Sequence, residues 1–138
     1  MLDTNVISEL LKPKPEPKVT TWIDGTDEEL LFLSVLTLGE IRKGVMLLPR
    51  SARRTALEAW LSKELLLRFS NRILSVDQEV ADQWGHLSSL TSARGVHVGV
   101  IDGLLAATAI QHNLTLVTRD TRDVAATGVI LFNPWTDA

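Results

Sequence analysis

Apolar residues in this chain form short continuous runs separated by stretches with helical spacing. Runs of strand length occur at residues 30–35, 73–76, 114–117 and 129–132. Continuous apolar runs of this kind are typical of parallel strands that are covered on both faces. Because strands and helices alternate along the whole chain, the pattern predicts an α/β fold, a three-layer α/β/α sandwich with a central parallel sheet.

Helical spacing of apolar residues predicts six helices between and around these strands. They are expected at residues 6–11, 19–23, 38–48, 57–65, 80–90 and 102–112. Asp77 precedes the fifth of them, where a carboxylate caps the first turn, and Gly95 closes that helix. At 138 residues the length fits one domain, so residues 1–138 are expected to form a single domain.

The helix predicted at residues 102–112 is apolar or small on nearly every side, which indicates a helix packed against several neighbours. Asp102 stands at its start, and Asp120 follows the strand predicted at 114–117. In α/β folds, ligands bind in the crevice at the carboxyl ends of the strands. Asp102 and Asp120 are therefore the first candidates for a functional site.

Two further acids occupy comparable positions. Asp3 follows the apolar pair Met1-Leu2, and Glu40 follows the strand predicted at 30–35. Two apolar residues are few for a central strand, which usually has about 5–6 residues, so either this strand is unusually short or the natural start lies upstream. In a parallel sheet all four acids converge at one edge.

Several carboxylates in one crevice repel each other unless a divalent cation neutralises them. Oxygen ligands select Mg²⁺ or Mn²⁺. The chain has no cysteine, so any metal is held by oxygen or histidine, and the scattered His86, His97 and His112 are expected to be solvated or at the core edge. A carboxylate-held metal lowers the pKa of a bound water and clamps a phosphate oxygen, which is the chemistry of phosphodiester hydrolysis.

Each acid also has a structural alternative. Asp3 and Asp120 could serve as helix caps or turn residues. The segment from Thr37 to Glu40 has the form of a capping box, in which the glutamate accepts a hydrogen bond from the Thr37 N–H. Asp102 is the hardest acid to explain structurally, because a helix this apolar offers a lone carboxylate little solvent.

Charge and hydropathy limit the remaining classes. The net charge of −3 excludes a uniformly basic nucleic-acid coat but not a local basic rim, and Arg119 and Arg122 are candidate phosphate contacts beside Asp120. Asp123 is a candidate fifth acid. The apolar run at 98–110 is too short to span a membrane, and no signal peptide opens the chain, so a cytoplasmic protein without membrane contact is expected.

The order of the motifs resembles the PIN-domain ribonucleases, in particular toxins of the VapC and FitB type. The matching stretches are LDTNVISEL, LTLGEIRKGV, VIDGLLAATAIQHNLTLVTRD and FNPW, which span nearly the whole chain. By this resemblance, the catalytic acids are Asp3, Glu40, Asp102 and Asp120, with Asp3 and Asp102 as the direct metal ligands. Thr4, Asn5 and Thr118 match positions that orient those acids by hydrogen bonds.

The resemblance also implies Mg²⁺ or Mn²⁺ as cofactor, RNA as substrate and a homodimer. It implies a small antitoxin that blocks the active site, and promoter DNA bound only through the antitoxin complex. The predicted function is thus a metal-dependent endoribonuclease, the toxin of a type II toxin–antitoxin system. Two alternatives stay open: a receiver-like phosphoacceptor, which needs a lysine after a late strand although none follows Lys63, and a catalytically inactive PIN-like binding module.

Overall fold

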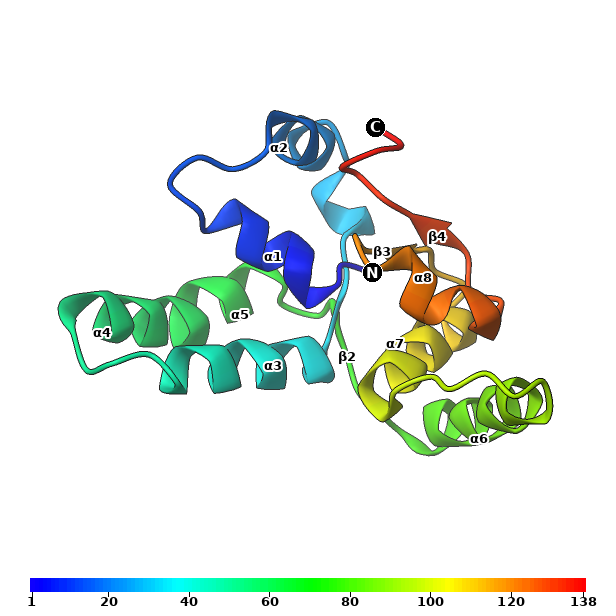
Figure 1. Cartoon of the computed structure of the whole chain (residues 1–138). Coiled ribbons are helices and arrows are strands. Elements are labelled where there is room, and N and C mark those ends of the chain that lie inside the picture. The colour runs from blue at the N-terminus through cyan, green and yellow to red at the C-terminus, as the bar shows by residue number, and fades with distance from the viewer.

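Two pairs of parallel strands form the centre of the fold (Figure 1) in the computed structural model, which describes residues 1–138. The strands are β1 (Leu33–Ser34) with β2 (Ile73–Leu74), and β3 (Leu116–Val117) with β4 (Leu131–Phe132). Leu2 joins the two pairs, because its N–H donates to the Phe32 carbonyl at 2.9 Å and it forms a parallel bridge with Val117. The predicted parallel arrangement is confirmed.

Helices surround these strands. Their bounds are α1 (Thr4–Leu10), α2 (Pro17–Asp24), α3 (Val35–Met46), α4 (Ala52–Ala59), α5 (Leu66–Arg68), α6 (Gln78–Ala93), α7 (Val100–Gln111) and α8 (Thr121–Val124). A π-helical segment η2 (Trp60–Leu65) connects α4 to α5, and 3₁₀ turns lie at η1 (Glu28–Leu30) and η3 (Ala125–Thr127). None of the helices combines the length and apolar character that crossing a membrane requires.

Two separate apolar cores make the fold three-layered. One contains side chains of α1, α2, α3 and η2, and the other contains side chains of α6, α7 and α8. Successive strand residues belong to different cores. Leu2 and Val117 lie in the first core, whereas Met1 and Leu116 lie in the second. Since successive strand residues point to opposite faces, the helices cover both faces, as predicted and as Figure 1 shows.

The strands are shorter than the apolar runs that predicted them. In the run at 30–35, Leu30 ends the turn η1 and is 65% exposed. Val35 already belongs to α3, because Ser34 caps that helix by accepting a hydrogen bond from the Leu36 N–H at 3.0 Å. An apolar run alone does not distinguish a strand from the first turn of a buried helix.

Helix α7 is buried along most of its length, as its sequence predicted. Its approach to α6 depends on Gly103, where an added Cβ would lie 3.0 Å from Nε1 of Trp84. The helix begins at Val100, two residues before the predicted start, so Asp102 lies within its first turn. At the start of α6, Asp77 accepts a hydrogen bond from the Val80 N–H at 2.9 Å and is the predicted cap.

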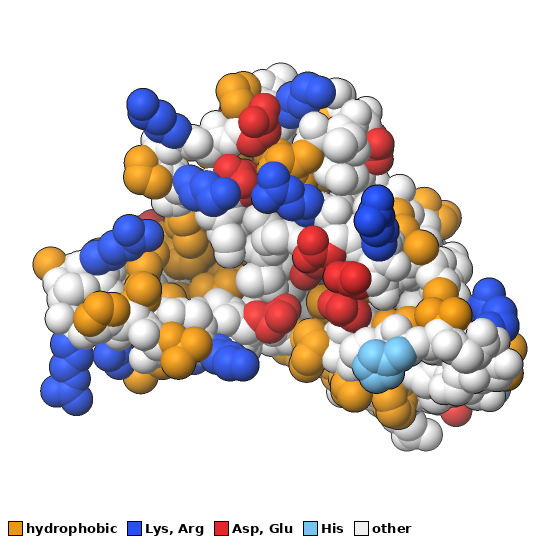
Figure 2. Space-filling model, viewed as in Figure 1, with side chains coloured by type: hydrophobic (Ala, Val, Ile, Leu, Met, Phe, Trp, Pro, Cys, Tyr) orange, Lys and Arg blue, Asp and Glu red, His pale blue; other side chains and the backbone are white.

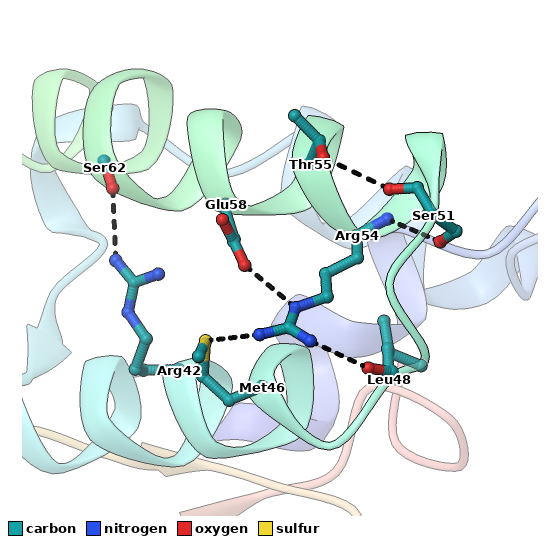
Figure 3. A network of polar contacts seen from close by, with 8 residues as sticks. All are labelled: Arg42, Met46, Leu48, Ser51, Arg54, Thr55, Glu58 and Ser62. Atoms are coloured by element: carbon teal, nitrogen blue, oxygen red, sulfur yellow. Dashed lines mark hydrogen bonds and ion pairs between the residues drawn. The ribbon is translucent and has the colours of Figure 1, made fainter.

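The corner between α3 and α4 is held by Arg54 (Figure 3). Its guanidinium donates to Oε1 of Glu58 at 2.9 Å and to the Leu48 carbonyl at 3.3 Å. Arg42 links α3 to η2 by donating to Oγ of Ser62 at 3.1 Å. These contacts fix the orientation of α3, which contains Glu40.

Candidate active site

Asp3 is held in place from three sides. Its N–H donates to the Val117 carbonyl at 2.9 Å, which ties it to β3. Its carboxylate accepts hydrogen bonds from the Thr4 N–H at 2.7 Å and from the Thr118 hydroxyl at 2.8 Å. Asp3 is therefore both the cap of α1, as one alternative predicted, and a fixed carboxylate at the carboxyl end of the strands.

Asn5 links Asp3 to Asp120. Its side-chain amide donates to the Thr118 hydroxyl at 3.1 Å and to Oδ2 of Asp120 at 3.2 Å, and it reaches Oδ2 of Asp3 at 3.5 Å. The Arg119 N–H in turn donates to Oδ1 of Asn5 at 3.4 Å. Thr4, Asn5 and Thr118 thus contact the acids through hydrogen bonds, which is the arrangement expected for orienting residues.

Glu40 is not the end of a capping box, and that alternative is wrong. Ser34 caps α3, so Thr37 lies inside the helix, where its hydroxyl is buried without a hydrogen-bond partner. The Glu40 carboxylate instead accepts a hydrogen bond from the Thr4 hydroxyl at 2.7 Å. The sequence pattern placed the start of this helix three residues too late, and in the structure Glu40 contacts Thr4 of α1.

Asp102 extends from the first turn of α7 and takes part in none of the side-chain hydrogen bonds of the structure. Burial raises its pKa, and the negative charges of Asp123, Glu40 and Asp120 raise it further. Burial is also the main cause of the raised pKa of Asp3. Hydrogen bonds oppose that rise at Asp3, whereas none opposes it at Asp102.

A polar cleft of about 370 Å³ unites these residues. It is lined by Asp3, Thr4, Asn5, Ser8, Glu9, Lys12, Glu40, Asp102, Arg119 and Asp120, with no hydrophobic side chain among them. Figure 2 shows acidic side chains gathered on this face with basic side chains beside them. The cleft brings the four predicted acids together, while the candidates Arg122 and Asp123 on α8 do not line it.

Sequence reasoning did not identify Glu9 and Lys12, which also line the cleft. Glu9 is only 5% exposed and accepts a 2.9 Å hydrogen bond from the Lys12 ammonium. The available signal was their spacing of three residues, which places opposite charges on one side of a helix. That spacing is common on solvated helices and did not indicate a buried carboxylate.

The donor set suits a hard divalent cation, because it consists of carboxylate, hydroxyl and amide oxygens. As the side chains lie, no group of three or more His, Asp or Glu residues is close enough to hold a metal ion. Thr118 and Thr4 restrain Asp3, whereas Asp102 has no hydrogen bond to break. A cation in this cleft would therefore need the acids to lie closer together than they do in this structure.

The chain is similar to proteins of one family along most of its length. The model of the PIN domain family matches residues 1–128 of this chain. The toxin FitB of Neisseria gonorrhoeae is 42% identical over 137 residues, which is 99% of each chain. The VapC ribonuclease Y4jK of Sinorhizobium fredii is 38% identical over 138 residues, which is all of this chain and 99% of the relative.

Solved structures show the same likeness. The crystal structure of FitAcB from Neisseria gonorrhoeae matches with a TM-score of 0.93 and 41% identity, covering 98% of this chain and 97% of that one. FitAB bound to an IR36 DNA fragment matches with a TM-score of 0.92 and 40% identity, covering 97% and 94%. VapBC2 from Rickettsia felis, bound to a promoter DNA fragment, shares the fold at 23% identity with a TM-score of 0.79, covering 96% of each chain.

Proposed function

The chain belongs to the PIN domain family, and we propose that it is the toxin of a type II toxin–antitoxin system, a metal-dependent endoribonuclease. The relatives named VapC ribonuclease and toxin FitB support this function. The observation that carries the proposal is the convergence of Asp3, Glu40, Asp102 and Asp120 on one polar cleft. A cytoplasmic location, where RNA is available, accords with this activity.

Asp3 and Asp102 are the residues that would hold Mg²⁺ or Mn²⁺, with Glu40 and Asp120 contributing directly or through water. When bound, the cation neutralises the carboxylates and supplies the Lewis acid for phosphodiester hydrolysis. The raised pKa values of Asp3 and Asp102 support this assignment, because they show that the cleft disfavours further negative charge.

The chain's own residues set the geometry for hydrolysis. Thr4 and Asn5 hold the carboxylates of Glu40 and Asp120 by hydrogen bonds, and both acids line the cleft. In that position they orient a water for in-line attack on the phosphorus and accept its proton. The bond between the phosphorus and the 3′ oxygen breaks, and that oxygen takes a proton from solvent, which leaves a 5′-phosphate and a 3′-hydroxyl. Preorganised carboxylates reduce the reorganisation that the reaction requires.

We also propose a small antitoxin as partner, which covers the cleft and brings the complex to promoter DNA. The similarity to FitAcB and to FitAB bound to DNA supports both points. A homodimer is part of the same proposal. The receiver-like alternative lacks support, since the relatives are named as ribonucleases and toxins and no lysine follows Lys63.

The deciding experiment is RNA cleavage by purified protein with Mn²⁺ or Mg²⁺, with and without chelator. Wild-type protein is expected to cleave only with metal, and Asp102→Asn is expected to lose cleavage. Asp77→Asn is the matched control, because it changes an aspartate that caps α6 away from the cleft. Equal cleavage by wild type and Asp102→Asn would overturn the proposal.

An inactive binding module with structural carboxylates is the remaining alternative, and it is favoured by the absence of three acids close enough together to hold a metal ion. The melting temperature separates the two proposals. A ligand that binds only the folded protein stabilises it, so Mn²⁺ is expected to raise the melting temperature of wild type but not of Asp102→Asn. An unchanged melting temperature together with absent cleavage would favour the binding module.

A further inference from the structure

A second polar hollow, of about 420 Å³, adjoins the carboxylate cleft. Glu9, Lys12 and Arg119 line both, so the two form one continuous surface. The second hollow adds Lys14, Glu16 and Trp135 but none of the four acids of the proposed active site. Figure 2 shows basic side chains alongside the acidic group on this face. The second hollow thus has three cations against the two carboxylates of Glu9 and Glu16, whereas acids outnumber cations in the carboxylate cleft.

The cations of the second hollow are available to an anion. The guanidinium of Arg119 lies 4.9 Å from the ring centroid of Trp135, a cation–π contact. Neither Arg119 nor Lys14 takes part in any of the ion pairs of the structure. Both residues are exposed.

Lys12 is held beside Arg119 by a buried carboxylate. Glu9, 5% exposed, accepts hydrogen bonds from the Lys12 ammonium at 2.9 Å and from the Glu16 N–H at 3.1 Å. The second bond ties the proline-containing loop between α1 and α2 to the same carboxylate. An ammonium has three donors, so Lys12 keeps donors free for a ligand while its position is fixed.

We propose that this second hollow binds a phosphate next to the scissile phosphate of single-stranded RNA, through Lys12 and Arg119, with Glu9 as the positioning residue for Lys12. The inference rests on the proposed ribonuclease function and names where its substrate binds. The cleft itself repels phosphate through its carboxylates, and the net charge of −3 gives no general attraction. Affinity for RNA therefore has to come from cations at the rim.

Binding of a labelled single-stranded oligoribonucleotide, followed by fluorescence anisotropy in chelator, tests this subsite without cleavage. Lys12→Ala and Arg119→Ala are each expected to weaken binding about 5- to 10-fold at low salt. Each is also expected to reduce the slope of log affinity against log salt by about 0.7, the value for one phosphate contact on a single strand. Lys63→Ala is the matched control, because Lys63 is an exposed lysine on η2 outside both hollows.

The proposal would be overturned if Lys12→Ala and Arg119→Ala both bound RNA with the same affinity and the same salt slope as Lys63→Ala. Because binding is measured without metal, this result is distinct from failure of the proposed function, which appears as absent cleavage by wild type in Mn²⁺. In cleavage assays with Mn²⁺, the two variants are expected to raise KM with little change in kcat. An unchanged KM would also count against the subsite.

A double-mutant cycle tests the positioning role of Glu9. Glu9→Gln keeps an oxygen that accepts the Glu16 N–H but removes the charge that holds Lys12. If Glu9 positions Lys12, then Lys12→Ala weakens RNA binding less in the Glu9→Gln background than in wild type. If Glu9 has only a structural role, Lys12→Ala weakens RNA binding by the same factor in both backgrounds. That result would overturn this part of the proposal. Circular dichroism establishes that each variant is folded.

Discussion

The hydroxyl of Thr4 donates a 2.7 Å hydrogen bond to Oε1 of Glu40, and this contact joins α1 to α3 across the cleft. The backbone N–H of the same threonine donates to the Asp3 carboxylate at 2.7 Å. One residue thus orients two of the four acids, one through its side chain and one through its main chain.

Thr4→Val removes the hydroxyl and keeps the shape and the backbone donor. We expect a loss of about 1 kcal/mol or less in the free energy of unfolding, the size of one exposed hydrogen bond. Mn²⁺-dependent cleavage of RNA is expected to fall about 10-fold, because Glu40 loses its fixed orientation. Thermal melts and kcat/KM measure the two effects. Thr4→Ser should restore activity, and wild-type kcat/KM in Thr4→Val would show that the contact is not needed.

Asp102→Asn is expected to leave the metal-free protein as stable as wild type or more stable. Burial and neighbouring acids raise the pKa of Asp102, so its charge is disfavoured in the folded state and its removal relieves repulsion. Nuclease activity is expected to fall to background at the same time. Melts in chelator and cleavage in Mn²⁺ give the two readings, and near wild-type cleavage would remove Asp102 from the site.

Glu40→Gln separates charge from hydrogen bonding. The glutamine oxygen still accepts the Thr4 hydroxyl, so stability in metal-free buffer is expected to stay within about 1 kcal/mol of wild type. Most Mn²⁺-dependent cleavage is expected to be lost, because a neutral amide is a poor ligand for a hard cation. Full activity in this variant would indicate a site of three carboxylates.

Acid should destabilise the protein in part through Glu9. The hydrogen bond from Lys12 is the main cause that lowers the pKa of Glu9 from its ordinary value of 4.5. A lowered pKa in the folded state adds stability above pH 4.5, and that stability is lost as the pH falls through the folded value. Urea unfolding at a series of pH values should show that Glu9→Gln loses less of its free energy of unfolding in acid than wild type does. Identical pH profiles would contradict this.

Asp3 changes the stability of the protein with pH in the direction opposite to Glu9. Burial raises its pKa above the ordinary value of 3.8, so the folded protein takes up a proton there before the unfolded chain does. The contribution of Asp3 to the free energy of unfolding therefore rises as the pH falls from the pKa of Asp3 in the folded protein toward 3.8. For this reason the Glu9 effect is measured as a difference between variants rather than from wild type alone.

The homodimer is expected to use apolar helix faces of residues 38–48 and 57–67 that the core leaves uncovered. Leu47 and Leu67 are each 76% exposed. Leu47 also lines a mainly apolar groove of about 520 Å³ that includes Ile101. Light scattering should give twice the monomer mass at micromolar concentration, and Leu47→Glu should reduce it. A monomer mass for wild type would count against the dimer.

The sequence predicted those features that depend on residue type and spacing. The apolar character of α7 indicated its burial, and Asp77 marked the start of α6. The position of acids after apolar runs predicted their convergence, because parallel strands bring their carboxyl ends to one edge. These inferences need only chain direction and periodicity.

Other features depend on particular hydrogen bonds between side chains and the backbone and could not be read from the sequence pattern. The start of α3 depends on Ser34 bonding to the Leu36 N–H, so the competing pattern from Thr37 to Glu40 gave the wrong boundary. Burial of Glu9 depends on the loop that reaches it through Glu16. Neither contact has a signature in hydrophobic periodicity.

The position of residues 1–3 between the two strand pairs affects when the protein becomes active during its synthesis. Asp3 receives its hydrogen bond from Thr118, 115 residues further along the chain. A ribosome makes Asp3 first, yet this carboxylate gains its fixed position only after Thr118 and Asp120 have been added. A partly translated chain therefore lacks the complete carboxylate cleft, which forms only when synthesis of the chain is nearly finished.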